Sequence, residues 1–196
     1  MSLSRQQFTL LGIFALFIGP VLLVILMRSS WWQYQPSGMK NHGHLVQPAV
    51  SLSLQQSADI ENKWLVLYVL EQPCEQACIE NVTALRQIHR AAGRNGEHLA
   101  IVLLSEILID PELETRLEAI YPGFNLVADS SDTALTTLQS VNAQIPPDPA
   151  GPNDIRTYIL DPMRNVILAY GANANPNDLH KDLKRLLKWS DQEKRH

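Results

Sequence analysis

The sequence contains very little cysteine: Cys74 and Cys78 are the only two in 196 residues. A single pair excludes the disulfide-dense scaffold of small secreted domains. An excess of one charge is also lacking, because 16 Lys and Arg face 20 Asp and Glu and leave a net charge of −4. That balance argues against a nucleic-acid surface. There is no internal repeat, phosphate-binding glycine loop or Ser-His-Asp pattern, so the two thiols are the main candidates for chemistry.

One long apolar stretch lies near the N-terminus. Phe8 to Met27 covers 20 residues without a charge, and at about 1.5 Å per residue such a helix crosses a ~30 Å hydrocarbon core. Secretory signals have a shorter apolar core and a small-residue cleavage site. Here Trp31, Trp32 and Tyr34 follow, which is typical of an aromatic belt at a membrane interface. We expect one uncleaved transmembrane helix, with a removed signal peptide as the alternative.

The orientation of this anchor rests on indirect grounds. Arg5 precedes it, and Arg28 and Lys40 follow it, so the positive-inside count is nearly even. A single N-terminal anchor with a short leader commonly leaves the large domain outside the cytoplasm, where a cysteine pair can be oxidised. We therefore expect the domain on that side.

The segment after the anchor contains Pro, Gly and Asn without an apolar period. It predicts a linker that passes into an extended lead-in, with residues 45–54 pairing at a sheet edge. His42 and His44 form an H-x-H pair here. Such a pair can bind a metal, but we interpret the two as solvated linker histidines.

Strand and helix patterns alternate through the rest of the chain. Near-continuous apolar runs predict buried strands at residues 64–70, 98–105, 124–129, 155–161 and 165–171. Apolar residues at spacings of three and four predict helices at residues 75–92, 110–122, 130–144 and 175–189. Asp110 with Pro111, and Asp132, are expected at helix starts. The order β-α-β-α-β-α-β-β-α predicts an α/β, thioredoxin-like fold with one N-terminal transmembrane helix.

The cysteines fall where the first long strand gives way to a helix, as in thioredoxin-like proteins. Pro73 suits this junction because it has a fixed φ and no N–H to lose. Cys74 and Cys78 then lie one turn apart at the positive end of the helix, which favours thiolates. Their Cα atoms should be roughly 6 Å apart, which allows a disulfide. We expect an exposed, labile bond or a pair that chelates a soft ion such as Cu(I); a structural brace is the alternative.

The segment "NKWLVLYVLEQPCEQACIENVTALRQIHRAAG" resembles the core of Sco-type proteins, membrane-anchored thioredoxin-like factors of cytochrome c oxidase assembly. "RTYILDPMRNVILAYG" is similar to their late hairpin and "DLHKDLKRLLK" to their terminal helix. The resemblance covers roughly residues 43–188 and the anchor. It implies a bacterial inner-membrane protein with its domain in the periplasm, whose partner is a respiratory oxidase subunit or another assembly factor and not nucleic acid.

The resemblance has one departure. Sco-type copper sites add a histidine before the late strand, and Asn153 occupies that place here. Asn is a poor copper ligand beside imidazole. The remaining histidines offer no evident substitute: His89 is expected on the solvated side of the cysteine helix, and His98 and His180 flank other elements. The implied copper site is therefore Cys74 and Cys78 alone, suited to Cu(I).

The expected organisation is a leader and anchor at residues 1–30, a linker and lead-in at 31–55, a thioredoxin-like domain at 56–190 and a tail at 191–196.

The expected function is to assist assembly of a respiratory haem–copper oxidase. Cys74 would act as the attacking thiol in thiol–disulfide exchange and Cys78 as its resolving partner, or both would bind Cu(I). The alternative is a non-catalytic module that docks on an oxidase subunit or assembly factor, and burial of both sulfurs would favour it. A general periplasmic reductase is disfavoured, because it should have C-x-x-C and a proline before the late strand, for which only Pro152 is near.

Other charged residues suggest simpler roles. Several carboxylates could suggest a metal site but stand at loops and helix starts, where caps belong: Asp59, Glu61, Asp110, Glu112 and Glu114. The basic, amphipathic C-terminal stretch could contact a membrane, but leucines facing a core and lysines facing water explain it as well.

Overall fold

The computed structural model describes residues 14–22, 41–54, 59–70, 73–146 and 154–193. The chain divides into two units, residues 1–40 and 41–196. In the first unit, residues 14–22 form a helix with exposed side chains. None of the helices within the described ranges combines the length and apolar character needed to cross a bilayer. The other residues of the span expected at 8–27, namely 8–13 and 23–27, lie outside these ranges.

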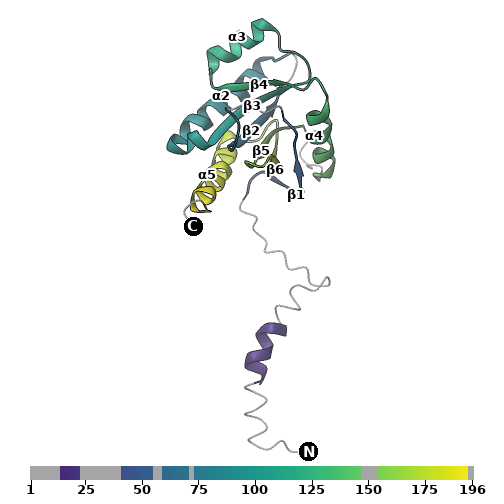
Figure 1. Ribbon diagram of the computed structural model, residues 1–196, viewed down its shortest axis with the longest axis vertical. Coiled ribbons are helices and arrows are strands. Elements are labelled where there is room, and N and C mark those ends of the chain that lie inside the picture. The colour runs from purple at the N-terminus through teal and green to yellow at the C-terminus, as the bar shows by residue number, and fades with distance from the viewer. Residues whose placement is uncertain (1–13, 23–40, 55–58, 71–72, 147–153, 194–196) are drawn as a thin grey trace, which may run out of the picture. The chain divides into compact units, whose positions relative to one another are not determined.

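The second unit is a six-stranded mixed sheet with helices on both faces (Figure 1). The strands are β1 (His44–Ser51), β2 (Trp64–Val69), β3 (Leu99–Ser105), β4 (Phe124–Ala128), β5 (Ile155–Leu160) and β6 (Asn165–Gly171). The helices are α2 (Gln76–Ala91), η1 (Gly93–His98, a 3-10 helix), α3 (Pro111–Ile120), α4 (Thr133–Gln144) and α5 (Pro176–Glu193). The sheet order is β1-β6-β5-β2-β3-β4.

The pairing of the strands confirms the predicted thioredoxin-like α/β fold. β2 pairs in parallel with β3, and β3 with β4, while β5 and β6 form an antiparallel hairpin against β2. Parallel neighbours require crossover helices, which α2 and α3 supply. β1 pairs antiparallel with β6 at the edge, as the lead-in was expected to do. The sequence did not predict η1, the short 3-10 helix that follows the cysteine helix α2 and precedes β3.

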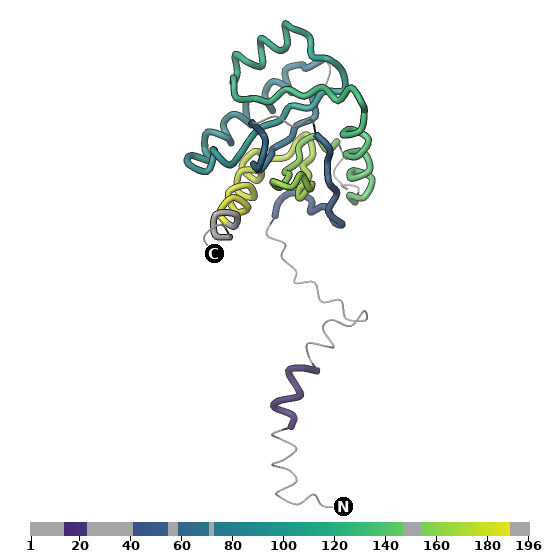
Figure 2. The backbone as a smooth tube through the Cα atoms, in the orientation of Figure 1, coloured from purple at the N-terminus to yellow at the C-terminus, as the bar shows by residue number. Residues whose placement is uncertain are grey.

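The two faces of the sheet bury separate apolar clusters. β2 shows why: Val66 and Tyr68 lie in one cluster, and Leu65 and Leu67 in the other, because alternate residues of a strand point to opposite faces. The first cluster includes side chains of α2, α3 and α5, and the second includes those of α4. The backbone trace shows the same division, with α4 apart from α2 and α5 (Figure 2).

The strand directions determine which strand ends lie at the same end of the sheet. β1 and β6, β6 and β5, and β5 and β2 are successive antiparallel pairs, so the start of β1 lies at the same end of the sheet as the last residue of β2. The chain therefore enters this unit at the end of the sheet from which the cysteine segment leaves.

Candidate functional site

The cysteine pair lies between β2 and α2. After β2 ends at Val69, exposed Pro73 and buried Cys74 precede Glu75, which is the N-cap residue of α2. Cys78 lies in the first turn of that helix. The strand-to-helix junction therefore holds both sulfurs, as the sequence predicted.

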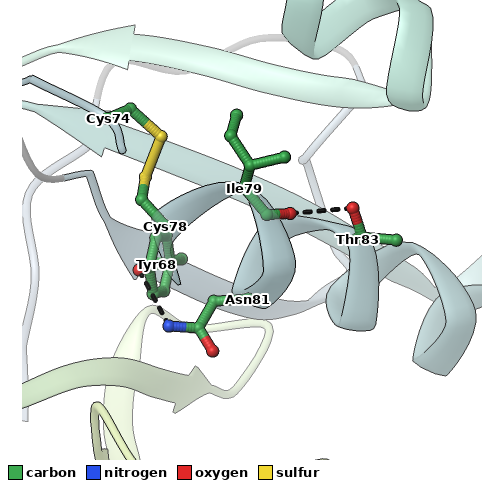
Figure 3. The surroundings of a disulfide bond; sticks show 6 residues. All are labelled: Tyr68, Cys74, Cys78, Ile79, Asn81 and Thr83. Carbon is green, nitrogen blue, oxygen red and sulfur yellow. Dashed lines mark hydrogen bonds between the residues drawn. A yellow bond between two sulfur atoms is a disulfide. The ribbon is translucent and has the colours of Figure 1, made fainter. Parts of the chain in front are cut away.

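Cys74 and Cys78 form a disulfide bond, with their Cα atoms 5.3 Å apart (Figure 3). The prediction of an exposed bond is wrong: Cys74 is 7% exposed and Cys78 is 1% exposed. Both belong to the apolar cluster that contains Tyr68 and Leu70. Both sulfurs are buried because α2 packs its apolar face onto the sheet, and Cys78 is the first residue of that face.

The first turns of α2 are fixed to β2 and to each other. The buried residues of α2 are Cys78, Val82, Leu85 and Ile88, spaced by three or four as an amphipathic helix requires. Asn81 donates a hydrogen bond to the Tyr68 hydroxyl at 3.4 Å, beneath the disulfide (Figure 3). Thr83 donates to the Ile79 carbonyl at 2.7 Å. Cys78 is thereby held on a packed helix.

A groove of about 640 Å³ opens beside the disulfide segment. Pro73 and Glu75, the neighbours of Cys74 on either side, line it, together with Glu106 after β3 and residues of α4 and β5. Tyr158 forms part of its wall and donates to the Asn142 side-chain oxygen at 2.7 Å. Burial outweighs that hydrogen bond and raises the pKa of Tyr158 to about 12. The groove has the size of a binding cleft.

The other predicted ligand residues do not gather around the sulfurs. His89 is half-buried, not solvated as predicted, because the Tyr121 hydroxyl contacts its Nδ1 at 3.1 Å and the Leu99 carbonyl contacts its Nε2 at 3.3 Å. Asn153 and Pro152 lie outside the described residues. Among the residues described, no group of three or more His, Cys, Asp or Glu side chains is arranged to hold a metal ion.

Asp110 and Asp132 both stand at helix starts, as predicted, but only the Asp110 side chain caps its helix. The Asp110 carboxylate accepts from the Glu112 N–H at the start of α3, with Pro111 in the first turn. Asp132 occupies the N-cap position of α4, but its side chain caps nothing and its φ is +55°. Asp129 replaces it by accepting from the Leu135 N–H at 2.9 Å. Asp132 is therefore free to face the groove that it lines.

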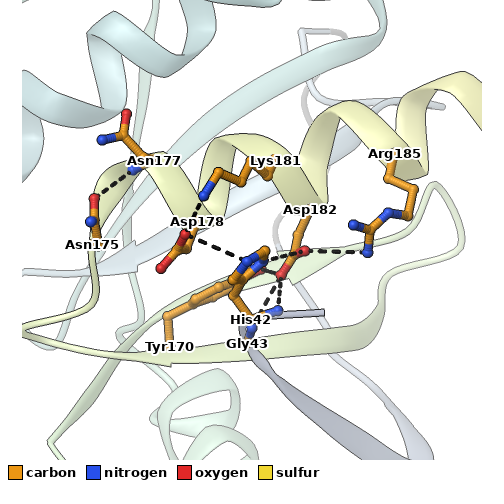
Figure 4. Close-up of polar contacts among 9 residues, drawn as sticks. All are labelled: His42, Gly43, Tyr170, Asn175, Asn177, Asp178, Lys181, Asp182 and Arg185. Atoms are coloured by element: carbon orange, nitrogen blue, oxygen red, sulfur yellow. Dashed lines mark hydrogen bonds and ion pairs between the residues drawn. The ribbon is translucent and has the colours of Figure 1, made fainter. Parts of the chain in front are cut away.

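One polar cluster around Asp182 is not foreshadowed by any sequence pattern. His42 and His44 are exposed, as expected, but His42 is also tied to α5: its backbone N–H donates to Oδ2 of Asp182 at 2.6 Å, and its Nδ1 lies 3.1 Å from Oδ1 (Figure 4). Gly43 N–H and the Tyr170 hydroxyl donate to the same carboxylate. A Cβ on Gly43 would lie 2.5 Å from the Tyr170 ring, so glycine is required there. The H-x-H pattern points to the imidazoles, whereas two backbone N–H groups and the Tyr170 hydroxyl contact the carboxylate together with the His42 ring.

The Asp182 carboxylate is buried yet ionised. Burial alone would raise the pKa of Asp182, but hydrogen bonds from Gly43, His42 and Tyr170 outweigh it and lower the pKa. Burial, and then the charge of Asp182, raise the pKa of Tyr170, so its hydroxyl stays a donor. The segment before β1 is thereby fastened to α5.

Comparison with solved structures gives the fold independent support. The apo Sco1 protein of Thermus thermophilus matches with a TM-score of 0.55 and 15% identity, over 76% of this chain and 99% of that one. Arabidopsis thaliana ScoI, solved with copper bound, matches with 0.52 and 14%, over 72% and 98%. A SCO1/SenC family lipoprotein of Bacillus anthracis matches with 0.50 and 18%, over 72% and 98%. The expected resemblance to Sco-type proteins is thus confirmed in the fold.

Comparison with curated proteins finds no match. A family model described as "Transmembrane-like, thioredoxin-like, C-terminal domain" matches residues 64–190, from the first residue of β2 to within α5. This match spans well over half of the chain and includes the disulfide, the groove and Asp182. The chain therefore belongs to the family of transmembrane-like, thioredoxin-like C-terminal domains.

Proposed function

We propose that this protein is a membrane-anchored thioredoxin-like factor that assists assembly of a respiratory haem–copper oxidase by thiol–disulfide exchange. The observation that carries the proposal is the Cys74–Cys78 disulfide at the junction of β2 and α2. A bond across four residues closes so short a loop that it restricts the unfolded chain only modestly. Chemistry is therefore a better reason for the bond than bracing.

The proposed exchange starts from the disulfide. A thiolate of a partner dithiol attacks Sγ of Cys74, the S–S bond breaks, and Cys78 leaves as a thiolate. The partner's second thiolate then attacks the partner sulfur of the mixed disulfide and releases Cys74. The partner loses two electrons and two protons and becomes a disulfide, while Cys74 and Cys78 become thiols. In the reverse direction Cys74 is the attacking thiol and Cys78 the resolving one.

The two sulfurs suit unequal roles. Cys74 retains 7% exposure and lies outside the helix, whereas Cys78 is 1% exposed within its first turn. Attack is therefore directed to Cys74. The positive end of α2 stabilises negative charge on Cys78, which is what a leaving thiolate needs.

Besides exchange, the reduced cysteine pair could bind Cu(I). Two thiolates are suitable ligands for this soft ion, and the Arabidopsis relative was solved with copper bound. The described residues supply no third ligand beside them. The two sulfurs fit Cu(I) in transit and do not form a complete Cu(II) site.

The proposed location is the bacterial inner membrane, with a single span at residues 8–27 and the domain in the periplasm. The uncharged 20-residue stretch and the transmembrane-like family description support it, and a persistent disulfide requires an oxidising compartment. Membrane fractionation with sodium carbonate, followed by protease treatment of spheroplasts, tests this location. Extraction by carbonate, or protection of the domain in spheroplasts, would contradict it.

A second candidate function has an observation in its favour. Because both sulfurs are buried, the domain could act as a docking module for an oxidase subunit or assembly factor, with the disulfide as a brace. The two functions differ in redox potential. A structural bond has a potential below about −300 mV, and an exchanging one has a higher value.

A trapping experiment separates the two functions. In membranes that contain the oxidase, a Cys78→Ser variant should accumulate a mixed disulfide between Cys74 and its partner, whereas Cys74→Ser should accumulate little. Equilibration of the wild-type chain with glutathione buffers provides the potential independently of the variants. Absence of mixed disulfide together with a potential below about −300 mV would leave only the docking function.

A further inference from the structure

We infer that the groove beside Cys74 binds a cationic segment of the partner polypeptide, in which basic side chains are accompanied by an apolar one. This inference rests on the proposed exchange at Cys74–Cys78, and it adds the chemistry of the segment that the site accepts. The groove has a volume of about 640 Å³, which is enough for several residues of extended peptide.

The groove is placed to guide a partner toward the disulfide. It lies at the end of the sheet where β2 and β3 terminate, with Leu70 N–H bonded to the Leu104 carbonyl at 2.8 Å. Pro73 and Glu75 both line it, although Cys74 between them packs into the cluster on the α2 face. A segment bound in the groove would therefore contact the residues on both sides of Cys74, whose sulfur is attacked.

The lining charges are predominantly negative. Glu75, Glu106 and Asp132 contribute three carboxylates, and all three are exposed. The cation among the described lining residues is Arg156, whose Nε lies 2.6 Å from Oδ1 of Asp154. Arg156 is thus already matched by a carboxylate, which leaves the groove attractive to Lys and Arg side chains.

Two of these carboxylates stand at helix starts without serving the helices. Glu75 and Asp132 occupy the N-cap positions of α2 and α4, yet neither side chain accepts a cap hydrogen bond. Asp is a strong N-cap residue, yet at α4 it is Asp129 that accepts from the Leu135 N–H. Both residues instead line the groove beside the two helix starts.

The surroundings of the groove also offer apolar contact and backbone recognition. Ile107 and Leu108 follow Glu106 directly and are 58% and 84% exposed. Such a pair contributes to binding when an apolar side chain covers it. The Asn142 side-chain oxygen is occupied by Tyr158, which leaves its amide group as a donor for a peptide carbonyl. These features favour a polypeptide over a small cation.

The binding test uses the full chain in detergent micelles and two labelled synthetic peptides. They have equal length and one leucine, and differ in having Lys or Glu at the same positions. Serine replaces cysteine in both, so that binding is measured without exchange. By fluorescence anisotropy the Lys peptide should bind about tenfold more tightly at low ionic strength. The preference should shrink at about 1 M salt, where the Debye length is about 3 Å.

Two variants with equal charge change locate the effect. Glu75→Gln/Glu106→Gln/Asp132→Asn should lose the preference, and Asn suits the positive φ at position 132. The matched control Glu97→Gln/Glu114→Gln/Glu118→Gln changes three exposed carboxylates that do not line the groove, and should keep it. No preference in the wild-type chain, or equal loss in both variants, would overturn the inference.

An exchange assay distinguishes failure of this inference from failure of the proposed function. The same peptides with cysteine restored, and dithiothreitol as an uncharged reference, are used to reduce the Cys74–Cys78 bond. Faster reduction by the Lys peptide supports the inference. Equal rates for the Lys and Glu peptides would overturn it and leave the exchange function intact, since dithiothreitol serves only to show that the bond can be reduced. A bond that resists all three would overturn the exchange function, and the binding result would then describe a docking groove.

Discussion

The backbone N–H of His42 donates a hydrogen bond to Oδ2 of Asp182 at 2.6 Å, across 140 positions of sequence. His42 lies just before the edge strand β1, and Asp182 lies on the buried face of α5 with 2% exposure (Figure 4). The contact fixes the point at which the chain enters the thioredoxin-like unit. This point is at the same end of the sheet as the cysteine segment.

Asp182→Ala should destabilise the domain strongly. The substitution leaves the N–H groups of His42 and Gly43 and the Tyr170 hydroxyl without their acceptor. We expect the free energy of unfolding to fall by about 3 kcal/mol, measured by urea denaturation. The control Glu80→Ala removes an exposed hydrogen bond with Gln76 on α2, far from the cluster in sequence, and should cost less than about 1 kcal/mol. Equal losses would show that the buried carboxylate has no special role.

The contribution of Asp182 should disappear in acid. Hydrogen bonds hold its pKa below the ordinary value of 3.8, despite the opposing effect of burial. A carboxyl with a lowered folded pKa stabilises the protein fully above 3.8, and the stabilisation is lost as pH falls below that value through the folded pKa. The difference in unfolding free energy between wild type and Asp182→Asn should therefore be constant near neutral pH and shrink below about pH 4. A difference that is unchanged at pH 3 would contradict this.

The fold could be predicted because its elements carry local patterns. β2 is apolar on both faces, and α2 repeats its apolar residues at three and four, so a buried strand followed by an amphipathic helix is evident from the sequence. The position of Cys74 and Cys78 at that junction follows from the same patterns. Their burial did not follow, because it depends on how far α2 turns its apolar face toward the sheet.

The Asp182 cluster shows what the sequence could not reveal. In the pattern of α5 the aspartate looks like one of several charges on a solvated face. It is buried because Tyr170 of β6 and the N–H groups before β1 meet it there, and these partners are distant in sequence. Backbone donors carry no residue-specific signal, so a strand edge that supplies them is visible only in the folded chain.

Tyr158 should make stability fall at alkaline pH. Burial raises its pKa from the ordinary 10.0 to about 12, although the hydrogen bond to Asn142 opposes the change. A group with a raised folded pKa contributes stability below its unfolded pKa, and that contribution is lost as pH rises from 10 toward 12. Tyr158→Phe should cost about 1 kcal/mol at neutral pH. The variant should lose stability less steeply than wild type above pH 10, by up to about 1.4 kcal/mol per pH unit. Parallel curves for the two proteins would refute the assignment.

The two cysteines should differ in reactivity once the disulfide is reduced. Cys74 is the more exposed and precedes α2, whereas Cys78 is within the packed first turn. Iodoacetamide should therefore modify Cys74 at least about tenfold faster, since alkylation requires access as well as thiolate. Mass spectrometry of the full chain after brief labelling measures both rates at once. Urea-unfolded protein is the control and should show similar rates for both, and faster labelling of Cys78 in the folded chain would reverse the proposed roles.

Copper binding should depend on both sulfurs and on their reduction. The reduced chain offers two thiolates without a third described ligand, so we expect one Cu(I) per chain and weak retention of Cu(II). Titration with Cu(I) in the presence of a competing chelator measures the affinity. The oxidised chain and a Cys74→Ala/Cys78→Ala variant are the two controls, because each lacks thiolates at the site. Neither should take Cu(I) from the chelator. If the double variant binds as well as the reduced wild type, the cysteine pair is not the copper site, and the exchange reaction alone would account for the position of the two sulfurs.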